Sequence, residues 1–485
     1  MKRALLLPLL LCVQAFAQPQ FLQFVARVNA ITDINVKAAT IDSFMSVQQS
    51  AGFPAQEDSF AIFIRRSSAN SVSVAGDFNN WSATASALQK LNGTNFFYFI
   101  KAFELNARLD YKFVENGSSW ILDPLNPKTV NGGYGPNSEL AMSGYIQPWE
   151  IVFHPVTPAG TITNRTVYSQ IVSRTYQLKI YTPPGYSPSQ STLYPTVYFQ
   201  DGAEYVTLAS ATIVIDNLIA ARLIEPVIAI FVVPNNRNDE YQGNTRNLYR
   251  RFMAEELVPY IDSVYKTDAV AERRLVLGDS FGGNISGLIS HYHPDVFGNC
   301  GLHSGAFWPN NYETYNLLTQ APYNGVRYIS VWGTYESLWS NMRLFRDSMK
   351  LKGNEFIWSE LPEGHSWGLW RANIDIMLQT CFPPQPLSVH DEVAVNSFTL
   401  SNNYPNPFNP STSFTVEVPE QIAGSIIIYN SQGEELERLF EGYLNKGVTR
   451  FRFDGTGLLS GIYYCVVGAG GRSITQPMML LKCLQ

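Results

Sequence analysis

Cysteine, histidine and charged residues are all scarce in this sequence. Its 485 residues include five cysteines and six histidines, and only 15% of them are Asp, Glu, Lys or Arg. The cysteines have none of the close paired spacing of zinc sites, so we expect no structural metal. Because 45% of the residues are hydrophobic, the low charge content argues against disorder and predicts folded domains with cores of their own.

Long apolar runs are absent beyond the N-terminus, so we expect no transmembrane helix. Residues 1–17 combine the basic pair Lys2-Arg3, the apolar run 4–13 and Ala15-Phe16-Ala17. These are the charged, hydrophobic and cleavage regions of a secretory signal peptide. Its removal changes the formal net charge from −6 to about −8. An acidic secreted protein has no electrostatic reason to bind nucleic acid or an anionic membrane.

Four cysteines remain after the signal peptide, at positions 300, 381, 465 and 483. Cys465 and Cys483 fall on two strand-like segments of one small C-terminal domain. A disulfide between them and two buried free thiols are both compatible with this placement.

The most informative motif follows an apolar strand. Residues 275–283 read Leu-Val-Leu-Gly-Asp-Ser-Phe-Gly-Gly, which places Ser280 between Gly278 and Gly282. This G-x-S-x-G spacing mounts a nucleophilic serine on a strand-to-helix turn so tight that the flanking positions must be nearly free of side chains. The motif predicts a serine esterase built on an α/β-hydrolase sheet.

His365 is the expected general base, because this fold requires the chain order serine, acid, histidine. It follows the strand expected over 355–361, where it is able to accept the proton of Ser280. The other histidines after Ser280 fit less well: His291 and His293 end a helix, His303 follows the serine too closely for an acid-bearing strand to intervene, and His390 lies in a proline-rich linker.

Glu336 is the expected acid. It is the only carboxylate in the loop after the strand expected over 327–332, and a glutamate there holds the imidazole of His365 in the required tautomer. Asp347 is the alternative, but it lies further on in a helical stretch that favours a solvated charge.

The oxyanion hole is expected from two backbone N–H groups. One is that of Phe281, which begins the helix after the nucleophile. The other is that of Gly202 or Ala203, in the turn after the strand 196–199. An ordinary Asp-Gly turn is the alternative interpretation of this second segment.

Further motifs accompany the Ser280 turn in the same order as in a known group of enzymes. They are residues 181–186 (Tyr-Thr-Pro-Pro-Gly-Tyr), 252–259, 294–298, 304–307 and 364–367 (Gly-His-Ser-Trp). From about 161 to 382 the chain resembles the group that includes esterase D, the feruloyl and acetylxylan esterases of carbohydrate esterase family 1, and the enterochelin esterases. The resemblance implies acyl transfer to water without a cofactor, with Glu336 standing where aspartate is commoner.

A separate β-rich segment precedes the esterase-like region. After a helical lead-in over 18–50, strands are expected at 60–64, 72–74, 96–100 and 111–114 of a sandwich over 54–147. Residues 74–81 and 120–124 are similar to family 48 carbohydrate-binding modules and related immunoglobulin-like early-set domains. The resemblance implies that Trp81, Lys112, Trp120 and Asn137 contact sugar, and a domain that only packs beside the active site is the alternative.

The last segment follows a proline-rich linker over 383–396. Residues 402–412 read Asn-Asn-Tyr-Pro-Asn-Pro-Phe-Asn-Pro-Ser-Thr, and alternating strands follow. The segment 397–485 resembles the C-terminal sorting domain of the bacterial type IX secretion system. This resemblance implies export across the outer membrane by that machinery, followed by release or surface attachment.

Together these features predict an α/β fold, in which the doubly wound sheet of an α/β-hydrolase over 150–382 is flanked by two small all-β sandwich domains. The expected function is a secreted serine ester hydrolase acting on feruloyl or acetyl esters of polysaccharides. A siderophore esterase is the alternative within the resemblance. A glycan-binding surface protein with an inactive hydrolase fold is the alternative of another class, and the serine, glutamate and histidine argue against it.

Overall fold

The computed structural model describes residues 19–384, 398–430, 433–469 and 472–482, which form two compact units that divide after Pro384. The expected signal peptide, Cys483 and nearly all of the expected linker lie outside the described residues. The suggested Cys465–Cys483 pairing therefore stays a prediction, as do the domain boundaries.

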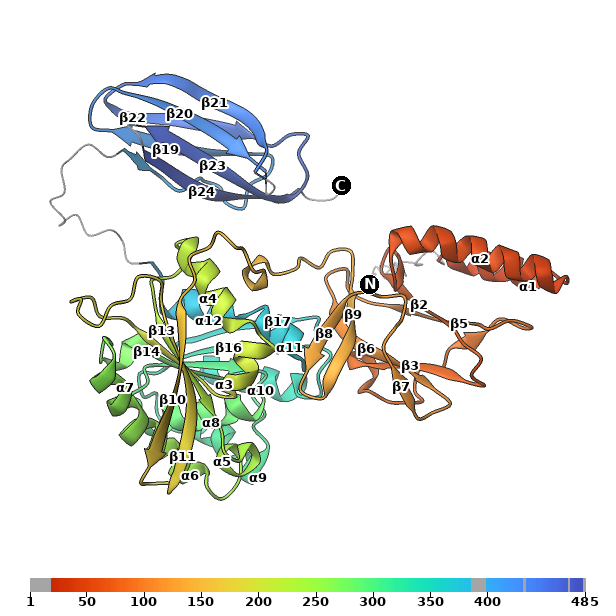
Figure 1. Ribbon diagram of the computed structural model, residues 1–485, viewed down its shortest axis with the longest axis horizontal. Helices are drawn as coiled ribbons and strands as arrows, with labels where there is room; N and C mark the ends of the chain where they lie inside the picture. Colours follow the sequence, from red (N-terminus) through yellow and green to blue (C-terminus); the bar gives the residue numbers. More distant parts are fainter. Residues whose placement is uncertain (1–18, 385–397, 431–432, 470–471, 483–485) are drawn as a thin grey trace, which may run out of the picture. The chain divides into compact units, whose positions relative to one another are not determined.

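An eight-stranded sheet forms the centre of the first unit (Figure 1). Its first two pairings, β10–β11 and β11–β13, are antiparallel, and every pairing from β13 to β17 is parallel. In sheet order the strands are β10 (Thr161–Ser169), β11 (Arg174–Thr182), β13 (Ile228–Val233), β12 (Thr196–Phe199), β14 (Arg274–Asp279), β15 (Asn299–His303), β16 (Arg327–Gly333) and β17 (Phe356–Leu361). Strands buried on both faces need continuous apolar runs, and β12 and β14 are buried at every residue.

Helices cover both faces of this sheet. The helices α3 (Gly202–Thr207), α4 (Ala211–Ala220), α11 (Trp367–Arg371) and α12 (Ile374–Cys381) share a hydrophobic cluster on one face. On the other face lie α5 (Arg237–Tyr241), α6 (Arg246–Arg251), a π-helical turn (Phe252–Leu257), α7 (Val258–Val264), α8 (Phe281–Tyr292), α9 (Pro309–Gln320) and α10 (Trp339–Leu351). The predicted fold class, a doubly wound α/β-hydrolase sheet, is confirmed.

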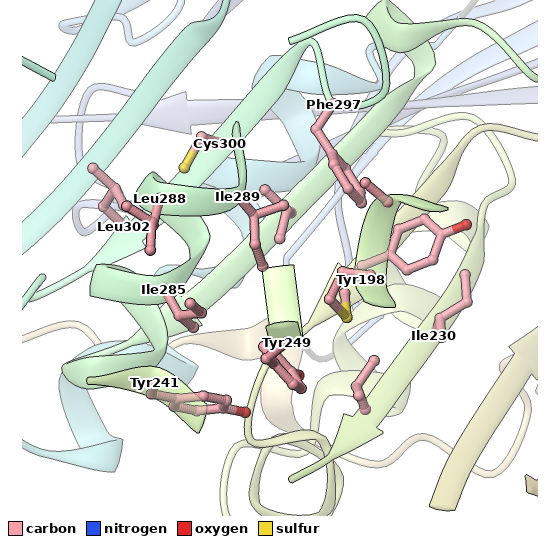
Figure 2. Close-up of a cluster of buried hydrophobic side chains, with 14 of the residues drawn as sticks. Tyr198, Ile230, Tyr241, Tyr249, Ile285, Leu288, Ile289, Phe297, Cys300 and Leu302 are labelled. Atoms are coloured by element: carbon pink, nitrogen blue, oxygen red, sulfur yellow. The ribbon is translucent and has the colours of Figure 1, made fainter. Parts of the chain in front are cut away.

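The helix α8 is anchored along its length. Figure 2 shows Ile285, Leu288 and Ile289 of α8 close to Cys300 and Leu302 of the sheet, and all five side chains are fully buried. Burying one such aliphatic side chain contributes about 1.5–3 kcal/mol. This packing fixes the N-terminus of α8, where Ser280 lies.

Two further sheets form a sandwich before the hydrolase sheet. One contains β1 (Ala55–Glu57), β2 (Phe60–Arg66), β5 (Phe96–Ala102) and β4 (Gln89–Lys90), and the other contains β3 (Val72–Gly76), β6 (Arg108–Glu115), β9 (Gly135–Ala141) and β8 (Thr129–Gly132), with β7 (Ser119–Ile121) beside β6. The helices α1 (Phe21–Ala30) and α2 (Ile34–Ala51) pack in one cluster with β2 and β5. The Asp33 side chain caps α2 by accepting from the backbone N–H groups of Asn35 and Val36.

The second unit is a small all-β structure with a core of its own. Its sheets are β18 (Thr399–Leu400), β19 (Ser411–Val418) and β22 (Gly447–Asp454), and β21 (Glu435–Leu444), β20 (Ile422–Tyr429), β23 (Gly461–Ala469) and β24 (Arg472–Leu480). Alternate residues of β19 and β23 point inward, and Cys465 is buried among them.

The turn after β14 leaves no space for a side chain at Gly278. A Cβ placed there would lie 2.4 Å from the carbonyl carbon of Gly282. We expect Gly278→Ala to lower the free energy of unfolding by at least about 2 kcal/mol, because backbone atoms must move apart. Gly133→Ala is the matched control, since a Cβ at Gly133 meets nothing within 4 Å. Urea denaturation measures both, and equal midpoints would contradict the expectation.

Candidate active site

Ser280 occupies a strained turn between β14 and α8. Its backbone has φ 52° and ψ −115°, a conformation that non-glycine residues rarely adopt. The turn is held because Ser280 N donates to the carbonyl oxygen of His303 at 2.8 Å, and the carbonyl oxygen of Ser280 accepts from Ala306 N at 2.9 Å. Strain at a half-buried serine with this sequence context is typical of a nucleophile.

His365 and Glu336 are brought together by the loops that follow β17 and β16. The distance from His365 Nδ1 to Glu336 Oε2 is 2.5 Å, and the other oxygen of Glu336 accepts from Gly333 N at 2.9 Å. The Glu336 side chain is fully buried, whereas one third of the His365 side chain is exposed. A buried carboxylate that fixes a partly exposed imidazole is the arrangement of a general base with its orienting acid. Asp347 lies exposed on α10, where it pairs with Arg346.

The His365 loop follows β17 and the Ser280 turn follows β14, so both lie at the carboxyl ends of the parallel strands. The His365 ring packs at 90° against Trp370, with 5.0 Å between ring centroids. Trp370 Nε1 in turn donates to the hydroxyl of Ser304, the residue after β15. Within the described residues no hydrogen bond joins Ser280 to His365. Such bonds are often long in ligand-free enzymes and tighten when substrate binds.

The expected oxyanion donors begin two neighbouring helices. Gly202 is the first residue of α3 and Phe281 is the first of α8, so both backbone N–H groups precede the first helical hydrogen bond. A Cβ at Gly202 would lie 2.3 Å from the carbonyl carbon of Phe231, so only glycine fits there. Ala203, the alternative donor, follows Gly202 in α3 and is half-buried.

An arginine that the sequence analysis did not single out connects these two helix starts. Arg237 Nε and Nη2 donate to the Asp201 carboxylate at 2.7–2.9 Å, and Arg237 Nη2 lies 3.6 Å from Asp279 Oδ2. Asp201 precedes Gly202, and Asp279 precedes Ser280. Burial, followed by the charge of Asp201, raises the pKa of Asp279 well above its usual range.

The other histidines that the structure describes after Ser280 lie in surroundings that do not suit a general base. His303 is fully buried, its Nδ1 is 2.8 Å from the hydroxyl of Tyr205, and burial lowers its pKa to about 4. His291 lies in the last turn of α8 and His293 directly follows that helix, and burial lowers the pKa of both. His390 lies outside the described residues.

The four residues expected to contact glycan lie on the N-terminal sandwich in different settings. Trp120 on β7 is 44% exposed, and Lys112 on β6 is half-buried. The Asn137 amide on β9 donates to Asp110 Oδ2 at 3.0 Å. Trp81 is half-buried, and its indole N–H donates to Asp77 Oδ1 at 2.9 Å. Trp120 is thus the most exposed of the four side chains.

Neither a metal site nor a membrane span is found in the described part of the chain. No group of three or more His, Cys, Asp or Glu side chains there is placed to hold a metal ion. No helix among these residues has the length and apolar character needed to cross a membrane.

Three segments of the chain match known families. Residues 169–380 match the family described as "Putative esterase". Residues 52–125 match carbohydrate-binding module 48, the isoamylase N-terminal domain, and residues 402–480 match the secretion system C-terminal sorting domain. The three resemblances predicted from sequence motifs are therefore confirmed. The sorting domain indicates type IX secretion to the exterior or the cell surface.

Individual relatives match parts of the chain. It is 32% identical over 145 residues to the uncharacterized protein YjcH of Bacillus subtilis, covering 29% of this chain and 60% of that protein. It is 30% identical over 158 residues to an endo-1,4-beta-xylanase/feruloyl esterase of Xylanibacter ruminicola, covering 30% of this chain and 22% of that protein. The chain thus spans 60% or less of the length of these two relatives.

Solved structures share the fold of a large part of this chain, and an enterobactin esterase is one of them. The enterobactin esterase of Shigella flexneri, determined in the presence of enterobactin, has a TM-score of 0.57 and 20% sequence identity. The likeness covers 67% of this chain and 94% of that protein. At this identity the comparison establishes the common fold.

The His365 loop contains a second buried carboxyl group, that of Glu363. It is 2% exposed and faces Arg108 as well as the carboxyl groups of Asp77, Asp110 and Glu139. Burial raises the pKa of Glu363 to about 7, against the opposing effect of Arg108. Between pH 4.5 and 7 the folded protein keeps this proton and the unfolded chain loses it. The contribution of the protonated Glu363 side chain to the free energy of unfolding is therefore complete below pH 4.5 and is lost as the pH rises through 7.

We expect Glu363→Gln to raise the free energy of unfolding at pH 8 by up to about 3 kcal/mol, because the neutral amide avoids a buried charge. At pH 5 we expect little difference, since wild-type Glu363 is then protonated. Denaturant titrations at both pH values measure the effect, with the exposed Glu272→Gln as control. An identical change at pH 5 and pH 8 would contradict the assignment.

Proposed function

We propose that this protein is a secreted serine carboxylic ester hydrolase. Ser280 is the nucleophile, His365 the general base and Glu336 the orienting acid. The observation that carries the proposal is the 2.5 Å contact between His365 Nδ1 and the buried Glu336, in a sheet that also carries the strained Ser280 turn. Each group meets the chemical requirement of its role in acyl transfer.

The reaction proceeds in two acyl-transfer steps. Ser280 Oγ attacks the ester carbonyl while His365 Nε2 accepts its proton, and Glu336 stabilises the resulting imidazolium. The N–H groups of Phe281 and Gly202 or Ala203 donate to the oxyanion. His365 then returns the proton to the leaving alcohol. Water hydrolyses the acyl-enzyme by the same route, and no cofactor takes part.

The proposed substrates are feruloyl or acetyl esters of polysaccharides. Three observations support this substrate class: the match to carbohydrate-binding module 48, the sorting domain, and the relative named as a xylanase/feruloyl esterase. An extracellular enzyme with a sugar-binding module meets polymeric substrates outside the cell. The type IX secretion machinery is the proposed export partner.

A siderophore esterase is the second candidate. It is favoured by the solved enterobactin esterase, whose fold matches over 94% of its length. Hydrolysis of methyl ferulate, acetylated xylan and a catecholate trilactone by the full-length protein separates the candidates, because only one class is expected to show a high kcat/KM.

We expect Ser280→Ala to abolish hydrolysis of p-nitrophenyl acetate without unfolding the protein, because only the nucleophilic oxygen is lost. Glu336→Ala should lower kcat by a smaller factor, since His365 remains but loses its orienting charge. Steady-state kinetics and thermal melting of each variant measure these effects.

Asp347→Ala is the matched control for Glu336→Ala, because its carboxylate is exposed and pairs with Arg346. Loss of activity in Asp347→Ala with near wild-type Glu336→Ala would overturn the acid assignment. Full activity of Ser280→Ala would overturn the esterase proposal. A wild-type protein that hydrolyses no ester but binds polysaccharide would favour an inactive hydrolase fold.

The sandwich offers a separate test of glycan binding. We expect Trp120→Ala to abolish the retardation of the protein in affinity gels containing soluble polysaccharide, because an exposed ring is lost from the sugar-stacking surface. Trp81→Ala should instead lower stability, by roughly 3 kcal/mol, since its half-buried indole is hydrogen-bonded to Asp77. A protein that migrates freely in every polysaccharide tested would reduce the sandwich to a structural partner.

A further inference from the structure

A fully buried arginine crosses from the sandwich to the loop that holds His365. Arg108 on β6 is 0% exposed, and its Nη1 donates to Ser366 Oγ at 3.2 Å. Its backbone N donates to the carbonyl oxygen of Pro362 at 3.1 Å. The residues on this loop contacted by Arg108 therefore lie on both sides of His365.

Two glycines show how closely the His365 loop packs against the sandwich. A Cβ at Gly364 would lie 2.0 Å from Cγ of Asp77, and a Cβ at Gly368 would lie 2.0 Å from Nη1 of Arg108. Each glycine has ordinary backbone angles, so closeness and not conformation requires it. The sandwich residues therefore leave the His365 loop no space to move toward them.

The acid loop is held from the sandwich as well. Tyr335, the neighbour of Glu336, donates its hydroxyl proton to Glu104 Oε2 at 2.6 Å, and its ring lies 6.1 Å from that of Phe103. The backbone N of Tyr335 donates to the carbonyl oxygen of Glu363 at 3.0 Å. The acid and base loops are thus bonded to each other and to the sandwich.

The electrostatics of this contact favour a fixed geometry. Arg108 Nη2 lies 2.7 Å from Asp110 Oδ1 and 3.0 Å from Glu139 Oε2, and all three side chains are buried. A charge removed from water is tolerated only where its partners keep their positions, so a shifted loop would leave Arg108 without its hydrogen bond to Ser366.

We propose that the N-terminal sandwich is part of the catalytic apparatus, in which Arg108 and Glu104 are positioning residues that hold the side chains of His365 and Glu336 in their relative positions. Arg108 acts through Ser366, and Glu104 acts through Tyr335. This inference rests on the proposed esterase function. It assigns the sandwich a role in the rate of the chemical step, independent of any glycan that it binds.

The test uses two small deletions of hydrogen bonds in the full-length protein. Ser366→Ala removes the acceptor of Arg108, and Tyr335→Phe removes the donor to Glu104. We expect each to lower kcat for p-nitrophenyl acetate about tenfold with little change in KM, because misplaced catalytic groups slow the chemistry of a small bound ester. The pH dependence of kcat and the downfield NMR signal of the proton between His365 and Glu336 should shift as well.

Matched controls remove equivalent bonds elsewhere in the same unit. Tyr98→Phe loses a hydrogen bond to Gln89, and Ser263→Ala loses one to the carbonyl oxygen of Tyr260. We expect wild-type kcat, pH profile and NMR signal in both. Arg108→Lys keeps the charge but shortens the reach to Ser366, and should lower kcat further. If it does not fold, the two smaller deletions decide.

Wild-type kcat, pH profile and NMR signal in Ser366→Ala and Tyr335→Phe would overturn the inference while leaving the esterase proposal intact. Loss of thermal stability without a change in the pH profile or NMR signal would also overturn it, because a merely structural contact predicts that pattern. Activity in Ser280→Ala would instead overturn the proposed function itself.

Discussion

The close approach of two backbone segments at the Ser280 turn is the constraint on which the rest of the hydrolase unit depends. Gly278 and Gly282 approach each other so closely that a Cβ at Gly278 would lie 2.4 Å from the carbonyl carbon of Gly282, and Ser280 between them has a strained conformation. Such strain persists only where surrounding structure over-determines it. The buried apolar face of α8 and the parallel strands β12, β14 and β15 supply that structure. The other site residues follow the carboxyl ends of parallel strands of the same sheet: Gly202 after β12, Glu336 after β16 and His365 after β17.

A second constraint comes from burying charge where the sandwich meets the hydrolase loops. Arg108 faces Asp110, Glu139 and Glu363, Arg371 lies 3.4 Å from Glu139, and Asp77 faces Glu363, so four carboxyl groups and two guanidinium groups meet in this contact. Protonation of Glu363, whose pKa burial raises to about 7, relieves the imbalance. The contact is therefore most stable at mildly acidic pH. Its geometry is set by hydrogen bonds and by the tight contacts at Gly364 and Gly368 more than by a net attraction between the buried charges.

A site residue can be predicted from the sequence when the motif that identifies it lies within a short segment, and not when it depends on a contact between distant segments. The Ser280 motif is contained in nine residues, and the chain order of the fold then selects Glu336 and His365, which the structure places in contact. Arg108 and Ser366 are 258 residues apart, and charges at alternate positions of a strand are typical of a solvent-facing surface. The only local trace of the contact is the pair of glycines, Gly364 and Gly368, on either side of His365. Arg237 leaves no such trace.

The side chain of Asp110 contacts residues of both roles considered for the sandwich, glycan binding and positioning of the His365 loop. Asp110 accepts from the Asn137 amide at 3.0 Å through one oxygen and pairs with Arg108 at 2.7 Å through the other. Asn137 belongs to the expected glycan surface, and Arg108 reaches the His365 loop. Because neighbouring strands β6 and β9 carry these groups, a sugar bound near Asn137 would lie on the same rigid sheet that buttresses the catalytic loop. Polysaccharide recognition and catalysis would then share one scaffold.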